Sequence, residues 1–155
     1  MTGMNRLQGK HLVLGVTGSI AAYKAVSLLR TLKAQGAEVS VVMTKSATKF
    51  VTPLTFSVLS GRAVCTELWP DDHTMAHLAL TDRADAVVIA PATANCLAKS
   101  AVGMADDLLS TVLLGAQCPV LMVPAMDGGM WEHPAVQANV QTLRSRGVLV
   151  LSPDT

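Results

Sequence analysis

The chain has 155 residues, a length that fits one domain with a sizeable core. Half of the residues are hydrophobic, 15% are charged and 3% are aromatic, and the formal net charge is +1. This near-neutral balance gives no electrostatic basis for binding nucleic acid or an anionic membrane. The high apolar content favours a surface that is partly covered by other subunits.

The sequence also bears on location. No apolar run approaches the roughly 18 residues of a membrane-spanning helix. The first ten residues, MTGMNRLQGK, are polar and unlike a secretory signal. Cys65, Cys96 and Cys118 are an odd number without close spacing, so neither a disulfide framework nor a metal site is expected. We therefore predict a cytoplasmic protein.

Short apolar runs alternate with segments of helical periodicity along the whole chain. Strands are predicted at 11–16, 39–43, 87–89, 120–123 and 148–151. Helices are predicted at 20–34, 47–50, 53–60, 77–82, 104–115 and 134–146, with a helical run after Asn95 and an irregular segment or weak strand at 65–72. This alternation predicts a single α/β domain, a doubly wound parallel sheet in a Rossmann-like three-layer α/β/α arrangement.

The segment 85–99, DAVVIAPATANCLAK, is expected to lie at the centre of a binding site. Residues 87–89 predict a strand buried on both faces, and Pro91 is expected to end its pairing because proline has no N–H to donate. Small polar residues then lead into a helix, where free N–H groups and the helix dipole can meet a ligand. The strand ends at 15–19 and 124–131 have a similar character, so one shared pocket is predicted.

The sequence GVTGS at 15–19 leads from a strand through two glycines into a helix. This pattern presents N–H groups to a phosphate, although a tight turn without a ligand has the same pattern. A dinucleotide-binding fold favours an acidic residue near the end of the second strand, to hold a ribose diol. Here Thr44, Lys45 and Ser46 follow that strand, and two hydroxyls with a cation suit a phosphate. The pattern therefore favours a mononucleotide such as FMN over NAD.

Three further features have a structural as well as a functional interpretation. His77 lies in the apolar segment MAHLAL, where most histidines are structural, whereas a functional His77 would be a general base. Asp106 and Asp107 lie at a helix start, which favours N-capping and compensation of the helix dipole over an acid pair. The segment PAMDGGMW at 124–131 predicts either a loop wrapped on a ligand or a turn whose Trp131 packs on the surface.

Together, GVTGSIAAYKA, MAHLAL, APATANCLAKSAVGMADDLL and PAMDGGMW resemble the flavoprotein cysteine decarboxylases, in particular the phosphopantothenoylcysteine decarboxylases. In bacteria these typically form the N-terminal half of a bifunctional coenzyme A biosynthesis protein. The resemblance implies FMN as cofactor, phosphopantothenoylcysteine as small-molecule substrate, and a homotrimer, often assembled into a dodecamer, with flavins between subunits. The implied reaction oxidises the cysteine side chain to a thioaldehyde, releases carbon dioxide and returns the hydride, giving phosphopantetheine.

The resemblance also assigns residues by motif. Those expected to bind FMN are Gly18, Ser19, Ile20, Thr44, Ser46, Thr93, Ala94, Asn95 and Ala125. His77 matches the catalytic histidine of the family. Asp127 and Met130 are expected at the substrate.

Two departures from the family pattern bear on activity. The family usually has Asn where this chain has Asp127, and two facing carboxylates at 4 Å repel by roughly 4 kcal/mol at an effective dielectric of about 20. The domain at 1–155 is also expected to lack the family's flexible flap, whose cysteine protonates the ene-thiol. The alternatives are a relative that acts on a peptide's C-terminal cysteine, a flavin prenyltransferase, which PAMDGGMW disfavours, and a non-catalytic FMN-binding regulatory subunit.

Overall fold

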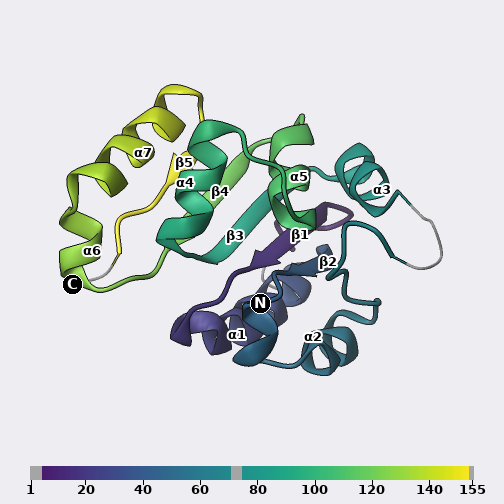
Figure 1. The fold of residues 1–155 in the computed structure, drawn as a ribbon. Helices are drawn as coiled ribbons and strands as arrows, with labels where there is room; N and C mark the ends of the chain where they lie inside the picture. Colours follow the sequence, from purple (N-terminus) through teal and green to yellow (C-terminus); the bar gives the residue numbers. More distant parts are fainter. Residues whose placement is uncertain (1–4, 71–74, 154–155) are drawn as a thin grey trace.

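The computed structural model describes residues 5–70 and 75–153. They form a parallel sheet of five strands in the order β2-β1-β3-β4-β5 (Figure 1). The strands are β1 (His11–Val16), β2 (Glu38–Met43), β3 (Ala86–Ala92), β4 (Val120–Pro124) and β5 (Leu149–Val150). The predicted α/β fold with a doubly wound parallel sheet is confirmed.

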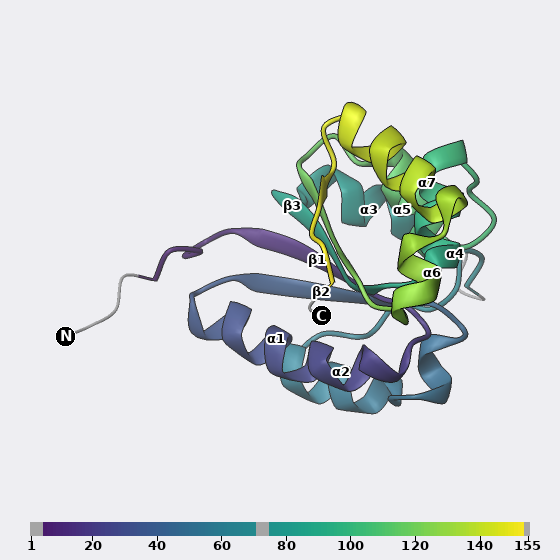
Figure 2. The same ribbon diagram turned by 90° about the vertical axis from the view of Figure 1, so that its left-hand side faces the viewer.

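Helices connect the strands and cover both faces of the sheet. In chain order they are η1 (Ile20–Tyr23), α1 (Lys24–Ala34), η2 (Ala47–Lys49), α2 (Pro53–Ser60), α3 (Ala76–Arg83), α4 (Ala94–Val102), α5 (Leu108–Gly115), α6 (Gly128–Glu132) and α7 (Pro134–Ser145). Figure 2 shows α1 and α2 on one face and α3, α4, α5 and α7 on the other, which gives the predicted three layers. No helix in the described ranges combines the length and the apolarity that a membrane crossing requires.

The core consists of two hydrophobic clusters, one on each side of the sheet. All six residues of β1 are buried, and they divide between the clusters by alternation. Val13 packs on the side of α4 and α5, whereas Leu12 and Leu14 pack on the side of α1. Since successive side chains of a strand point to opposite faces, a strand covered on both faces needs the unbroken apolar run that predicted it.

The strand order places a crevice between β1 and β3 at the carboxyl edge of the sheet. The chain leaves β1 through η1 and α1 toward one face, whereas it leaves β3 through α4 toward the other. The two connections diverge at this point, and ligands of open α/β sheets bind where such connections diverge. The sequence predicted that these strand ends meet, and the register of β1 with β2 and β3 confirms that they are neighbours.

Two predicted boundaries are wrong, one because of pairing with another strand and one because of local capping. Pro91 does not end β3, which continues to Ala92 and pairs it with Pro124 after a register shift. The shift accommodates a proline that has no N–H to donate. The helix expected from residue 104 begins only at Leu108, because Gly103 ends α4 in the left-handed conformation and Asp107 caps α5.

Smaller differences concern short segments. The helix expected at 20–34 starts as the 3-10 helix η1, and the segment expected as a loop or turn at 124–131 contains most of α6. In the weak segment predicted at 65–72, Cys65 forms a single parallel bridge with Val42, whereas residues 71 and 72 lie outside the described ranges.

Candidate functional site

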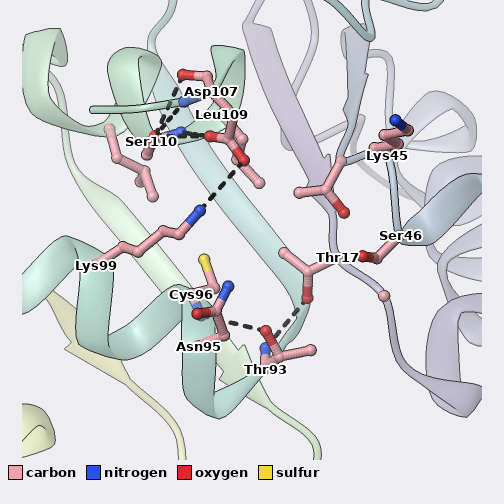
Figure 3. A pocket seen from close by; sticks show the side chains of 13 residues that line it. Thr17, Lys45, Ser46, Thr93, Asn95, Cys96, Lys99, Asp107, Leu109 and Ser110 are labelled. Carbon is pink, nitrogen blue, oxygen red and sulfur yellow. Dashed lines mark hydrogen bonds and ion pairs between the residues drawn. The ribbon is translucent and has the colours of Figure 1, made fainter. Parts of the chain in front are cut away.

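A polar cavity of about 360 Å³ opens at the carboxyl edge, on the face covered by α4 and α5 (Figure 3). It is lined by the turns that follow β1 and β2 and by the starts of α4 and α5. Five residues that the sequence assigned to the cofactor line this cavity together: Gly18, Thr44, Ser46, Thr93 and Asn95. Lys45, which the sequence indicated as a cation for the phosphate, lines it as well. Thr17, Lys99 and Ser110 also line it and were not among the assigned residues.

Thr17 joins the ends of β1 and β3 from a buried position. Its hydroxyl donates a hydrogen bond to the carbonyl oxygen of Pro91 at 2.5 Å and accepts one from the N–H of Thr93 at 3.1 Å. The Thr17 N–H donates to the same Pro91 oxygen at 3.4 Å. The hydroxyl therefore fixes the start of α4 against the turn that carries Gly18.

Gly18 lets the turn after β1 lie directly against the turn after β2. A Cβ atom at this position would overlap the side chain of Ser46 and would lie 3.0 Å from the Ser46 carbonyl carbon. Thr44 shapes the second turn, since its hydroxyl accepts a hydrogen bond from the N–H of Ala47 at 3.2 Å. The glycine is therefore required by the close approach of the two backbones rather than by a positive φ.

The N-terminus of α4, where Thr93 and Asn95 line the cavity, has free hydrogen-bond donors. The Thr93 hydroxyl caps the helix by accepting from the N–H of Cys96 at 3.2 Å. Among the described residues, none accepts a hydrogen bond from the N–H groups of Ala94 or Asn95. The helix dipole adds the equivalent of about half a positive charge at this end, so the cavity is suited to an anion.

Lys99 reaches from α4 toward the start of α5 (Figure 3). Its ammonium nitrogen lies 2.8 Å from Asp106 Oδ1 and 3.8 Å from Asp107 Oδ2. The hydrogen bond with Asp106 raises the pKa of Lys99 and lowers the pKa of Asp106. The predicted capping role of Asp107 is confirmed, because Oδ1 accepts from the N–H of Ser110 at 2.8 Å while the Ser110 hydroxyl accepts from the Asp107 N–H at 3.1 Å.

Cys96 also lines the polar cavity, but burial raises the pKa of its thiol to about 12. The thiol stays protonated near neutral pH. A protonated thiol is a weak nucleophile, so Cys96 serves as a small apolar wall of the cavity.

A second, apolar cavity of about 630 Å³ lies at the same edge on the opposite face, beside α1. Ser19, Ile20, Ala125 and Asp127 line it, together with apolar residues such as Leu28 and Leu151. The sequence predicted one pocket, whereas the structure divides the assigned residues between two cavities. Gly18 lines the polar cavity and the next residue, Ser19, lines the apolar one.

Asp127 caps the short helix α6. Its Oδ1 accepts a hydrogen bond from the N–H of Met130 at 2.9 Å. The carboxylate therefore has a structural partner on one oxygen while the residue lines the apolar cavity.

Three assigned residues line neither cavity. Ala94 is the first residue of α4, Met130 lies exposed on α6, and His77 lies half-buried on α3. Helix α3 packs against α5, so α5 separates His77 from the polar cavity. The buried Nδ1 of His77 has no hydrogen-bond partner among the described residues. His73, interpreted as a loop residue, lies outside the described ranges.

The residues that were missed carry weak signals in the sequence. Lys99 follows Asn95 by four positions, which places the two on one face of a helix. This spacing could have indicated a cation near the predicted phosphate site. Thr17 gives no comparable signal, because its role depends on the approach of β3, 74 positions away in the chain.

Residues 3–155 match the Flavoprotein family. The chain belongs to this family. It is 51% identical over 146 residues to the coenzyme A biosynthesis bifunctional protein CoaBC of Mycobacterium tuberculosis, an alignment that covers 94% of this chain and 35% of CoaBC. The chain thus spans about a third of the length of such relatives.

Solved structures of the family have the same fold. The crystal structure of SpaF, described as an FMN-dependent cysteine decarboxylase, is 39% identical with a TM-score of 0.88, covering 94% of this chain and 85% of SpaF. A mutant of PPC decarboxylase complexed with pantothenoylaminoethenethiol is 28% identical with a TM-score of 0.79, covering 94% of this chain and 82% of that one. The family and the fold of the chain are therefore established.

Proposed function

We propose that the chain is an FMN-dependent decarboxylase that converts 4′-phosphopantothenoylcysteine to 4′-phosphopantetheine for coenzyme A biosynthesis in the cytoplasm. The observation that carries this proposal is the pair of cavities lined by the adjacent residues Gly18 and Ser19, one rich in anion-binding donors and the other apolar. A molecule with a phosphate at one end and a flat ring at the other fits this division. The identity with CoaBC supports the choice of substrate.

The residues present suit FMN. The phosphate would be held in the polar cavity by the turn at Gly18, by Thr44 and Ser46, and by the start of α4 at 93–95. The ring system would lie along Ser19, Ile20 and Ala125, which line the apolar cavity. FMN, when bound, accepts a hydride from the substrate and later returns it, so that the cysteine carboxylate can leave as carbon dioxide between the two transfers.

The protein would bind the substrate, exclude water and move a proton. His77 would act as the general base that accepts the proton of the substrate thiol. Asp127 and Met130 would contact the substrate beside the apolar cavity. We expect the apolar walls of this cavity to exclude water from the reacting groups.

We further propose that the working unit is a homotrimer in which His77 of one copy serves the flavin of another. His77 lines neither the polar nor the apolar cavity that the described residues form. Large apolar side chains are also exposed, including Ile20 at 78%, Leu54 at 70% and Val58 at 71%. Apolar exposure of this extent favours a subunit contact. Native mass measurement of the flavin-loaded protein tests the assembly, and a monomer that turns over substrate would contradict it.

The experiment that tests the function combines a spectrum with product release. The purified chain is loaded with FMN and given phosphopantothenoylcysteine labelled at the cysteine carboxyl group. We expect the absorbance of bound oxidised flavin and the release of labelled carbon dioxide. A peptide that ends in cysteine is tested in parallel. The description of SpaF as a cysteine decarboxylase does not name phosphopantothenoylcysteine, so a family member can have another cysteine substrate.

Each other outcome replaces the proposal with a specific alternative. Release of carbon dioxide from the peptide but not from phosphopantothenoylcysteine would make the chain a peptidyl-cysteine decarboxylase. Bound flavin without release from either substrate would make it a non-catalytic FMN-binding subunit. Protein that cannot be reconstituted with FMN would contradict the proposal altogether.

A further inference from the structure

The polar cavity holds a sheltered cation that already has a partner. The side chain of Lys99 is only 21% exposed, and its ammonium nitrogen lies 2.8 Å from Asp106 Oδ1. Lys99 lines the cavity together with Thr44 and Ser46, whereas Asp106 does not. The ammonium group of Lys99 therefore lies between the cavity and the carboxylate of Asp106, which is outside the cavity lining.

Lys45 differs from Lys99 although it lines the same cavity. Lys45 is exposed on the turn after β2. The interaction of two charges weakens as the effective dielectric rises from about 20 near sheltered protein groups to about 80 in bulk water. An anion in the cavity should therefore gain much more from Lys99 than from Lys45.

The two neighbouring carboxylates are held differently. Asp107 Oδ1 accepts from the N–H of Ser110 at 2.8 Å and from its hydroxyl at 2.6 Å, so Asp107 is bound into the cap of α5. Asp106 lies in the preceding loop with its side chain 55% exposed, and the Ser110 hydroxyl donates a long hydrogen bond of 3.5 Å to the Oδ1 atom that also binds Lys99. Water can replace Lys99 at Asp106 more easily than at a buried carboxylate.

We propose that Lys99 selects a phosphorylated flavin over an unphosphorylated one, and that Asp106 competes with the cofactor phosphate for the Lys99 ammonium group. In the free protein Asp106 holds this group beside the cavity. When the cofactor binds, its phosphate replaces Asp106 as the partner of the Lys99 ammonium group, and water solvates Asp106. This inference rests on the proposed function, because it assumes that the polar cavity receives the phosphate of FMN.

The experiment measures binding rather than activity. Flavin-free protein is titrated with FMN and, separately, with riboflavin, which lacks the phosphate, and the quenching of flavin fluorescence gives each Kd. We expect Lys99→Met to weaken FMN binding about 10- to 100-fold, since it removes a charged hydrogen bond, and to leave riboflavin binding unchanged. The matched variant Lys45→Met should weaken FMN binding by no more than about threefold, and less in high salt.

The Asp106 variant tests the competition. Asp106→Asn should tighten FMN binding about two- to fivefold without affecting riboflavin, because it frees Lys99 and removes a negative charge. In the Lys99→Met background the same change should have little effect, since the two residues act through one contact. Lys99→Arg should retain the selectivity, and thermal unfolding of each flavin-free variant checks that the fold is intact.

The failures of the two proposals are distinguishable. Equal loss of FMN and riboflavin binding in Lys99→Met would make Lys99 a purely structural residue and overturn the inference. Unchanged FMN binding in Lys99→Met, with weakened binding in Thr93→Val, would overturn the inference but leave the phosphate site in place. Unchanged FMN binding in both variants would remove the phosphate from the polar cavity.

Discussion

The two edges of the sheet use polar residues in opposite ways. At the amino edge, His11 Nε2 lies 2.9 Å from the Ser40 hydroxyl, the His11 N–H donates to Asp85 at 2.8 Å, and Arg62 pairs with Glu38 at 2.8 Å. At the carboxyl edge, the first N–H groups of α4 have no acceptor among the described residues. Most polar groups at the amino edge therefore pair with one another; His11 Nδ1 is the exception, because it lies 3.7 Å from Glu38 Oε2 without a hydrogen bond to any described residue. Paired groups fix the fold, whereas the free N–H groups of Ala94 and Asn95 can serve a ligand.

The largest expected effect comes from the residue that joins two strands at the carboxyl edge. Thr17→Val keeps the shape of the side chain but leaves the Thr93 N–H without its acceptor and the Pro91 oxygen with one weak donor. We expect a loss of about 2–3 kcal/mol in the free energy of unfolding, measured by urea denaturation.

A threonine on the surface provides the control for this change. The Thr31 hydroxyl donates to the Ser27 carbonyl oxygen on the exposed side of α1. Thr31→Val should therefore change stability by less than about 0.5 kcal/mol. Equal effects of the two substitutions would mean that the Thr17 bridge does not hold β1 against β3.

The next effect tests the close approach of the two turns in the polar cavity. Gly18→Ala would place a methyl group against Ser46. Overpacking of this kind costs about 1–3 kcal/mol, so we expect FMN binding to weaken about 10- to 100-fold in a fluorescence titration. Gly128→Ala is the control, because no atom lies within 4 Å of the added Cβ. An alanine at residue 18 that binds FMN normally would remove this turn from the phosphate site.

A smaller effect is expected at the apolar cavity. Asp127→Asn should raise kcat/KM for decarboxylation about tenfold, because it removes a carboxylate that repels the substrate's own, and the exposure of Asp127 keeps the gain modest. Asparagine also caps helices well, so α6 should persist. Glu132 lies at the other end of α6 and does not cap the helix. Glu132→Gln also removes a carboxylate, and it should leave the kinetics unchanged. Unchanged kinetics in Asp127→Asn would end the repulsion hypothesis.

The sequence predicts the layers of this fold better than its cavities. The five strands were found because residues covered on both faces must be apolar without interruption, as in β1. The same logic does not extend to Pro91, because a register shift with β4 keeps it inside β3. Nor does it predict α6, whose two glycines disfavour a helix that the Asp127 cap nevertheless starts.

The division of the site depends on a detail that spacing alone does not reveal. Gly18 and Ser19 are adjacent in the sequence, yet they line cavities on opposite faces of the sheet. Strand β1 ends at Val16, and the turn that follows it borders the polar cavity at Gly18 and the apolar cavity at Ser19. The motif predicted the correct edge of the sheet, the carboxyl edge. The path of η1 and α1 determines on which face each residue lies.

The smallest effect probes the amino edge. Burial, followed by the charges of Arg62 and Arg83, lowers the pKa of His11 below 6.5, while Glu38 and Asp85 oppose the shift. The unfolded chain therefore binds a proton more readily than the folded one. Stability from this group is complete above pH 6.5 and is lost as the pH falls toward the folded pKa, with a slope of at most about 1.4 kcal/mol per pH unit.

Urea denaturation of the wild type and of His11→Gln between pH 5 and 7 measures this contribution as the difference between the two slopes. Arg62→Gln removes a cation that opposes protonation of His11, so the pKa of His11 in the folded protein should move back toward 6.5. The difference between the two slopes should therefore become smaller. FMN affinity should change little in these variants, since His11 lies at the edge of the sheet opposite both cavities. Parallel slopes in the wild type and His11→Gln would mean that the amino edge accommodates a charged histidine, and the contrast between an edge of paired polar groups and a ligand-binding edge would then fail there.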